Sequence, residues 1–142
     1  MRVVLDTASM VAAIRSGSGA SRQLLTAGLQ RRLTLVVSVP LMIEYQAVMT
    51  RPEHLRAASL TATDVGALLD AVAVVAESAR LAFLWRPALR DPDDDMVLET
   101  AVNGRADAVV TFNLRDFAEH VRRFGIEAWA PATAVGHLRR HA

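Results

Sequence analysis

The stretch Arg2–Thr7 (RVVLDT) sets the architecture, because a short apolar run there ends abruptly at Asp6. Four consecutive residues rich in valine and leucine are typical of a buried strand in a parallel sheet. The apolar spacing from Met10 to Ile14 then predicts a helix. An acid that closes such a strand lies at the carboxyl edge of the sheet, where open α/β proteins bind their ligands.

Beyond this stretch, short apolar runs alternate with segments of helical periodicity. Further strands are predicted at Leu33–Val37, Leu81–Trp85, Ala108–Thr111 and, at an edge, Ile126–Trp129. Helices are predicted over Ser21–Leu29, from Ser38 and Pro40 to near Arg51-Pro52, over Ala62–Ser78 behind a Thr61/Asp64 cap, over Met96–Val102, at the segment entered through Phe112–Phe117, and over Ala132–Arg140. This alternation predicts a three-layer α/β/α sandwich around a mainly parallel sheet of four to five strands.

Composition restricts the number of domains and the cellular compartment that we expect. With 142 residues, 52% of them apolar, we expect a single domain over residues 1–142. The absence of cysteine excludes disulfides and thiolate chemistry and suits a reducing, cytoplasmic setting. The first apolar run stops at Asp6, too early for a signal peptide, and no run is long enough for a membrane span. We therefore expect a soluble protein with no membrane partner.

The 16 basic residues are all arginine, which excludes several kinds of chemistry. A P-loop needs its lysine on the phosphates and a Schiff-base enzyme needs an amine. A phosphoacceptor domain built on Asp6 is disfavoured for a similar reason, since such folds usually pair the aspartate with a lysine. Arginine remains suited to phosphate contacts, because its planar fork binds two oxygens at once.

Four acids fall at or near the predicted carboxyl edge, namely Asp6, Glu44, Asp94 and Asp116. Two carboxylates about 4 Å apart repel each other by roughly 4 kcal/mol at an effective dielectric near 20. A fold that brings such groups together needs a compensating cation. Oxygen ligands without histidine or cysteine favour Mg²⁺ or Mn²⁺ over zinc. These ions activate water and neutralise charge on a phosphodiester, so phosphoryl chemistry is the natural hypothesis.

Four segments resemble those of PIN domains, in particular the VapC-like toxin ribonucleases, in the family's order and over nearly the whole chain. They are Val3–Thr7, Ser38–Tyr45 followed by Arg51-Pro52, Arg90–Asp95, and Val110–Phe117. The resemblance implies that Asp6, Glu44, Asp94 and Asp116 form an acidic quartet that holds one or two divalent ions. Asp94 is chosen over its neighbours because it precedes Val97, Leu98 and Ala101 with the family's spacing.

The resemblance also implies supporting residues. Thr111 and Asn113 match polar residues that flank the fourth acid and orient a carboxylate or a water. PIN domains usually carry a polar residue two positions after the first aspartate, where this chain has Ala8. Thr7 or Ser9 are the candidates to replace it, and catalytic competence depends on that replacement more than the fold does.

The function implied is a metal-dependent endoribonuclease acting on single-stranded or structured RNA, as the toxin of a toxin–antitoxin pair. A cognate antitoxin protein and homodimerisation are further implications. The alternative is a non-catalytic PIN-like module that binds RNA or protein through a degraded metal site. Affinity for Mn²⁺ discriminates the two.

Each acid also has an ordinary explanation when taken singly. Asp94 and Asp116 could cap helices, and Glu44 could lie on a plain surface. We expect solvated or surface positions for Asp91, Asp93, Asp95, Glu99, His54, His120, His137 and His141. For Glu99 the alternative is that it reaches the acidic site from one turn further along its helix. We expect core or interface positions for Trp85 and Trp129.

Overall fold

A computed structural model describes residues 1–82 and 92–141, with only the backbone described for Pro92 and Asp93. Its centre is a five-stranded sheet in the order β3-β2-β1-β4-β5, in which every neighbouring pair is parallel. The strands are β1 (Arg2–Leu5), β2 (Thr34–Val37), β3 (Glu77–Ser78), β4 (Ala108–Val110) and β5 (Glu127–Trp129). The predicted parallel sheet is therefore confirmed.

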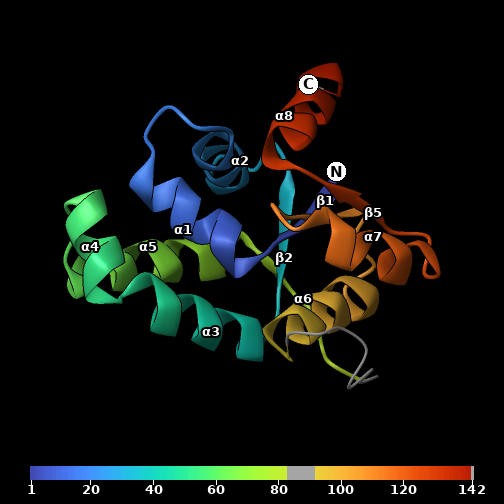
Figure 1. The fold of residues 1–142 in the computed structure, drawn as a ribbon, viewed down its shortest axis with the longest axis horizontal. Coiled ribbons are helices and arrows are strands. Elements are labelled where there is room, and N and C mark those ends of the chain that lie inside the picture. The colour runs from blue at the N-terminus through green and yellow to red at the C-terminus, as the bar shows by residue number, and fades with distance from the viewer. Residues whose placement is uncertain (83–91, 142) are drawn as a thin grey trace.

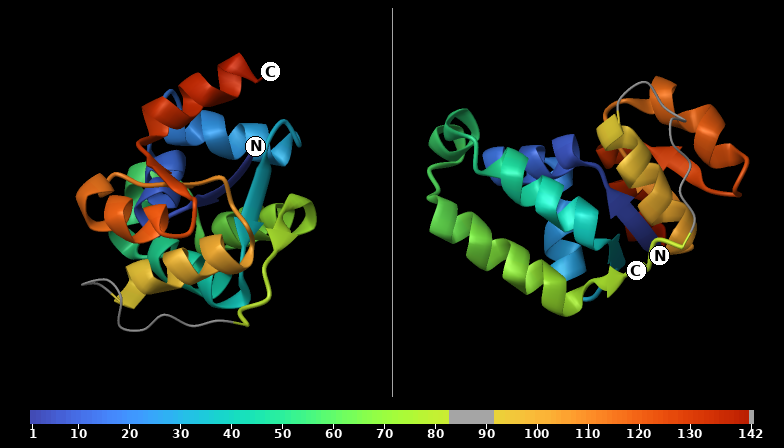
Figure 2. Two further views of the ribbon diagram at one scale, coloured as in Figure 1. Left: turned by 90° about the vertical axis from the view of Figure 1, so that its right-hand side faces the viewer. Right: turned by 90° about the horizontal axis from the view of Figure 1, so that it is seen from below.

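Within residues 1–82 and 92–141, eight helices flank the sheet and complete the predicted three-layer sandwich (Figures 1 and 2). They are α1 (Thr7–Arg15), α2 (Ala20–Leu29), α3 (Val39–Met49), α4 (Pro52–Ala58), α5 (Ala62–Val75), α6 (Pro92–Asn103), α7 (Leu114–Arg122) and α8 (Pro131–Arg140). From the central strand β1, the strands β2 and β3 are added on one side of the sheet. Strands β4 and β5 are added on the other side. Because parallel crossovers are right-handed, α1 and α2 cover the opposite face from α7.

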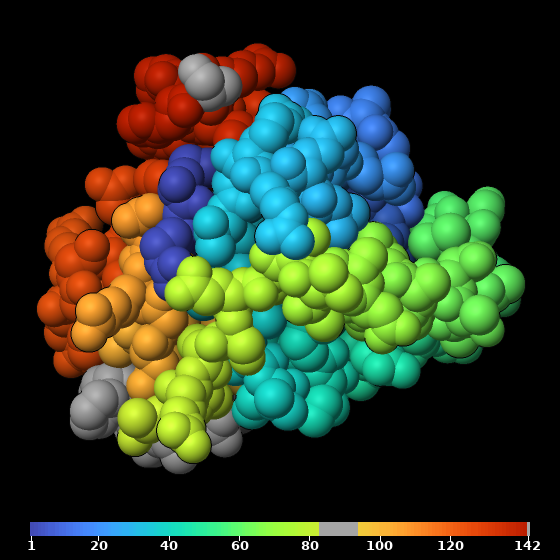
Figure 3. Space-filling view, turned by 180° about the vertical axis from the view of Figure 1, so that it is seen from behind, coloured from blue at the N-terminus to red at the C-terminus, as the bar shows by residue number. Residues whose placement is uncertain are grey.

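The helix layers pack closely around the strands. Seen from behind, α5 runs across the molecule between α2 and α3 (Figure 3), and it contacts both. On the other side α6 contacts α7 as well as β1 and β4. These contacts leave no face of the central strands open, as expected for a parallel sheet.

The register of β1 decides where the polar residues emerge. Val4 pairs with Val109 and Leu5 with Val110, and all four side chains are buried. The next residue on each strand is Asp6 and Thr111, so these two leave the sheet side by side. The Asp6 backbone N–H still donates to the Val110 carbonyl at 3.0 Å, which holds the two strand ends together.

Side chains cap the helices predicted to start at Ser38 and at Thr61, whereas the N-cap of α7 is Asn113 and not Asp116. The Ser38 hydroxyl accepts from the Leu41 N–H at 3.3 Å at the start of α3. Thr61 and Asp64 form a reciprocal capping box at the start of α5, with backbone-to-side-chain distances of 2.8 and 3.1 Å. These bonds satisfy N–H groups that a helix leaves without partners in its first turn.

Three predictions of local structure were wrong. The helix expected to reach Ser78 ends at Val75, and the third strand is Glu77–Ser78 within that span. Leu81 and Ala82 are not in a strand, and the rest of that predicted strand, including Trp85, lies outside the described residues. The helix Pro52–Ala58 was not predicted, because Arg51-Pro52 was interpreted only as the end of the preceding helix.

Among residues 1–82 and 92–141, no single helix is long and apolar enough to cross a membrane; α4 and α5 together pass only by length and composition, as a pair bent by 84°.

Candidate active site

The carboxyl edge between β1 and β4 is the point where the chain's direction of travel across the sheet reverses. Crevices at such switch points are the usual ligand sites of open α/β folds. A cavity of about 410 Å³ opens here, and three carboxylates, Asp6, Glu44 and Asp94, line it together with Asn113. Residues distant in sequence therefore meet in one cavity, as the spacing of the acids predicts.

Asp6 is the most enclosed of these acids, with only 5% of its surface exposed. It caps α1, and its Oδ1 accepts from the Ser9 backbone N–H at 2.8 Å. Burial raises the pKa of Asp6 above its ordinary value, because the charged form loses its hydration. Hydrogen bonds from the side chains of Thr111 and Ser9 and from the Ser9 backbone oppose this rise without cancelling it.

Tyr45 lies directly behind Asp6 and was not singled out from the sequence. Its side chain is buried, and its hydroxyl donates to the Leu5 carbonyl at 2.5 Å. Burial and, secondarily, the negative charge of Asp6 raise the pKa of the Tyr45 hydroxyl, so it stays protonated and keeps donating. The only sequence feature that could have indicated Tyr45 is that it directly follows Glu44 on the same helix.

Two helices bring the other cavity acids to the same edge. Glu44 lies half-buried on α3, and Asp94, also half-buried, lies in the first turn of α6. The hydroxyls of Ser38 and Thr100 are 2.7 Å apart and join the start of α3 to α6. Both hydroxyls are buried, and this bond ties the two helices together.

Asp116 does not line the cavity. The structure therefore brings together three members of the predicted quartet, and the fourth lies outside the cavity. Its Oδ2 accepts from the Asn113 side-chain amide at 2.7 Å. The Asn113 backbone N–H donates to the Thr111 hydroxyl at 2.9 Å, and Thr111 in turn bonds Asp6. Asp116 is thus connected to Asp6 through the two residues expected to support it.

The residues after Asp6 divide between the cavity and the core. Thr7 and Ala8 line the cavity. Ser9 is buried, and its hydroxyl bonds the Val110 carbonyl at 3.3 Å, so it braces β4. Of the two candidates to replace the missing polar residue at Ala8, Ser9 bonds the Asp6 carboxyl through its side chain and its backbone N–H, whereas Thr7 lines the cavity.

Two acids on α6 were wrongly expected at the solvent. Asp95 and Glu99 are 2% and 0% exposed. They lie four residues apart on a helix that is buried nearly all round, since Val97, Leu98 and Ala101 are buried as well. Of the other expected surface acids, Asp91 lies outside the described residues and only the backbone of Asp93 is described.

The donor set of the cavity suits a hard divalent cation, since all its anionic groups are carboxylates. Within the described part of the chain, however, no three carboxylate or histidine side chains lie close enough to share one ion. Mutual repulsion separates carboxylates that have no cation between them. Asp6, Glu44 and Asp94 would hold an ion after their side chains close on it.

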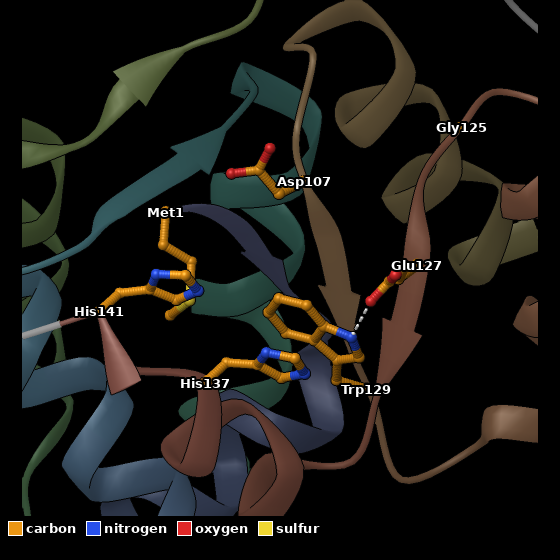
Figure 4. Close-up of a pocket in the computed structure, with 7 residues that line it drawn as sticks. All are labelled: Met1, Asp107, Gly125, Glu127, Trp129, His137 and His141. Atoms are coloured by element: carbon orange, nitrogen blue, oxygen red, sulfur yellow. Dashed lines mark hydrogen bonds between the residues drawn. The ribbon is translucent and has the colours of Figure 1, made fainter. Parts of the chain in front are cut away.

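A second and larger cavity, of about 540 Å³, opens at the amino edge of the sheet (Figure 4). There the Trp129 ring stacks on His137, with centroids 3.9 Å apart and planes 13° from parallel. The indole N–H donates to the Glu127 carboxylate at 2.6 Å. Trp129 is half-buried against the core, close to the expected interface or core position, whereas His137 is half-buried rather than a plain surface residue.

Comparison with known proteins agrees with this geometry. Residues 2–115 match the model of a family described as PIN domain. The fold is similar to a chain in the crystal structure of VapBC2 from Rickettsia felis bound to a DNA fragment from their promoter, with a TM-score of 0.59 and 18% identity over 91% of this chain and 99% of that one. No curated protein matches the chain.

Fold and site together define an α/β/α protein with a carboxylate cavity at its topological switch point. The family match covers most of its length, and the chain belongs to the PIN-domain family.

Proposed function

We propose that this protein is a divalent-metal-dependent endoribonuclease that acts in the cytoplasm as the toxin component of a toxin–antitoxin pair. One observation carries the proposal, namely that carboxylates from β1, α3 and α6 line one cavity at the switch point of the sheet. Metal-dependent nuclease chemistry uses such a group of oxygen ligands to hold the ion beside the phosphodiester. Membership of the PIN-domain family supports the same assignment.

Each residue has a definable task in this proposal. Asp6, Glu44 and Asp94 hold Mg²⁺ or Mn²⁺, which supplies an activated water and neutralises charge on the phosphate. Tyr45 and Ser9 fix the backbone and side chain of Asp6. Asp116, acting through Asn113 and Thr111, orients the Asp6 carboxylate from the β4 side. Single-stranded or looped RNA suits this open cavity, because its backbone is accessible.

Two observations support partner proteins. The similar solved structure is a chain of the VapBC2 assembly, which supports a cognate antitoxin here. Val39, Ile43 and Val74 are between 65% and 75% exposed on α3 and α5, and a groove between these helices is lined by Met42 and Leu69. An exposed apolar surface of this kind supports a homodimer.

The test is cleavage of a mixed-sequence single-stranded RNA by the purified protein, with Mn²⁺ or with EDTA, beside the Asp94→Asn variant. We expect cleavage with Mn²⁺ that EDTA and the substitution both remove. Glu119→Gln serves as the matched control, because Glu119 is an exposed acid on α7 that does not line the acidic cavity. Cleavage that persists in EDTA would contradict the proposal.

The alternative is a non-catalytic module that binds RNA or protein. Ala8 lines the cavity where a polar side chain is usual, which favours this alternative. It predicts RNA binding without cleavage and no uptake of Mn²⁺ by calorimetry.

A further inference from the structure

The acidic cavity has a second end with the opposite charge. Besides the carboxylates, Arg51 and His54 line it, from the junction of α3 and α4. Figure 1 shows α4 and α6 at opposite ends of the neighbouring helices α1 and α3. Because Asp94 lies on α6, the cavity runs from an anionic end to a basic end.

Arg51 lies beyond the end of the helix that carries Glu44. Glu44 and Val48 are about one turn apart on α3, which ends at Met49, and Arg51 follows its C-cap residue Thr50; residues 44, 48 and 51 all line the cavity. The five residues from Glu44 to Met49 correspond to about 7.5 Å along the helix axis. Among residues 1–82 and 92–141, no carboxylate forms an ion pair with Arg51, although three line the same cavity. Its side chain is exposed and lines the cavity, so an incoming anion can reach its guanidinium.

His54 is held in one orientation by a neighbouring helix. A guanidinium nitrogen of Arg15, in the last turn of α1, lies 3.3 Å from the His54 Nδ1. Arginine has only donors, so the Nδ1 accepts this bond and the neutral ring carries its proton on Nε2. His54 therefore retains one N–H donor for another acceptor.

We propose that Arg51 and His54 form a subsite for an RNA phosphate that flanks the cleaved one on a single side. This inference rests on the proposed nuclease function and deepens it. Because Arg51 lies beyond the end of α3, this phosphate is separate from the one at the carboxylates. Only the part of the strand on one side of the cleaved phosphate reaches Arg51 and His54, so cleavage should depend on nucleotides on that side alone.

The first test measures binding without cleavage. The Asp6→Asn variant, in which cleavage is expected to be absent, serves as the background, and a fluorescein-labelled 12-nucleotide RNA is the probe in anisotropy titrations with Mn²⁺. Adding Arg51→Ala weakens binding about ten- to hundredfold, as expected for a charged hydrogen bond. It also lowers the slope of log K against log salt by about 0.7, the value for one phosphate of a single strand.

Matched variants separate the subsite from general charge. Arg56→Ala removes an exposed arginine of α4 that does not line the cavity, and binding should stay unchanged. His54→Ala weakens binding about threefold, the loss of one neutral hydrogen bond, whereas His54→Gln restores it through its amide donor. Equal effects of Arg51→Ala and Arg56→Ala overturn the subsite.

The second test measures on which side of the cleaved phosphate the subsite acts. A series of RNAs, shortened one nucleotide at a time from either end, is cleaved by the wild type and by Arg51→Ala, both with Asp6 intact. We expect kcat/KM to fall sharply when one particular phosphate is removed from one end, and Arg51→Ala to be insensitive to that removal. Equal sensitivity at both ends overturns the inference.

The two hypotheses fail in different ways. If the wild type does not cleave but Arg51→Ala still weakens RNA binding, the nuclease function fails and the subsite stands. If the wild type cleaves and Arg51→Ala binds and cleaves like Arg56→Ala, the subsite fails and the nuclease function stands.

Discussion

The cavity at the carboxyl edge of the sheet and the cavity at its amino edge lie at opposite ends of the same strands. Their polar groups differ in hydrogen-bond partners and in pKa. At the amino edge Asp107 accepts from the Arg2 N–H at 2.8 Å, and Glu127 accepts from Trp129. At the carboxyl edge burial raises the pKa of Asp6, and Arg51 has no carboxylate partner among the described residues. The smaller cavity thus holds the carboxyl with the raised pKa and gathers three carboxylates with an arginine, so chemistry identifies the site better than volume does.

The largest expected effect would come from equivalent substitutions in the two cavities. Asp6→Asn should lower Mn²⁺-dependent cleavage at least about a hundredfold, the scale for loss of a group acting on the transition state. Glu127→Gln should leave the cleavage rate unchanged. Initial rates on one RNA at equal protein concentration measure both.

A folding control accompanies this pair. Burial makes the ionised form of Asp6 costly at neutral pH, so metal-free Asp6→Asn should melt at or above the temperature of the wild type. A variant that melts much earlier would show a structural defect, and activity lost in Glu127→Gln would break the comparison.

The rise in melting temperature on Mn²⁺ binding should show which of the two cavities holds the ion. An ion at 100 times its Kd stabilises the folded state by about 2.7 kcal/mol, which raises Tm by about 8 °C in a protein of this size. We expect this shift on adding Mn²⁺ to the wild type and to His141→Ala, and its loss in Asp94→Asn. A shift that disappears in His141→Ala instead would place the ion at the amino edge.

A smaller effect should follow from removing the hydroxyl behind Asp6. Tyr45→Phe leaves the buried Leu5 carbonyl without its donor, at a cost of about 1 to 3 kcal/mol in urea unfolding. Cleavage should fall about tenfold, because the strand end that presents Asp6 loses its support. Loss of stability with unchanged kcat would limit Tyr45 to a packing role.

The smallest effect is expected at the amino edge itself. His137→Ala removes the stacking on Trp129 and should lower the free energy of unfolding by about 1 kcal/mol. Cleavage and its Mn²⁺ dependence should stay as in the wild type. Thr133→Ala, at an exposed position of α8, is the control for changes on that helix.

Local patterns predicted the strands that are long and apolar and missed the one that is neither. β1, β2 and β4 carry buried runs of valine, leucine or alanine, and β5 carries the half-buried Ala128 and Trp129. β3 has two exposed residues, Glu77 and Ser78, and forms only because β2 offers it a partner. Such a strand depends on tertiary context, so its own residues carry no signal.

The candidate site was predicted in part for a related reason. The end of β1 and the cap of α3 are local features, and they placed Asp6 and Glu44 correctly at one cavity. Which face of α6 is buried depends on its packing against the sheet, so Asp95 and Glu99 were placed wrongly in solvent. His54 joins the cavity through the unpredicted helix α4, which no periodicity indicated. The roles of the acids remain predictions.

The nearness of the chain ends has a consequence for engineering. Met1 and His141 line the same cavity at the amino edge (Figure 4), on the opposite side of the sheet from the carboxylates. A short linker could join the ends, and the exposed turn at Gly17 and Ser18 could be opened in exchange. Circular permutation would thus relocate the termini while β1, α3 and α6 keep presenting their acids to one another.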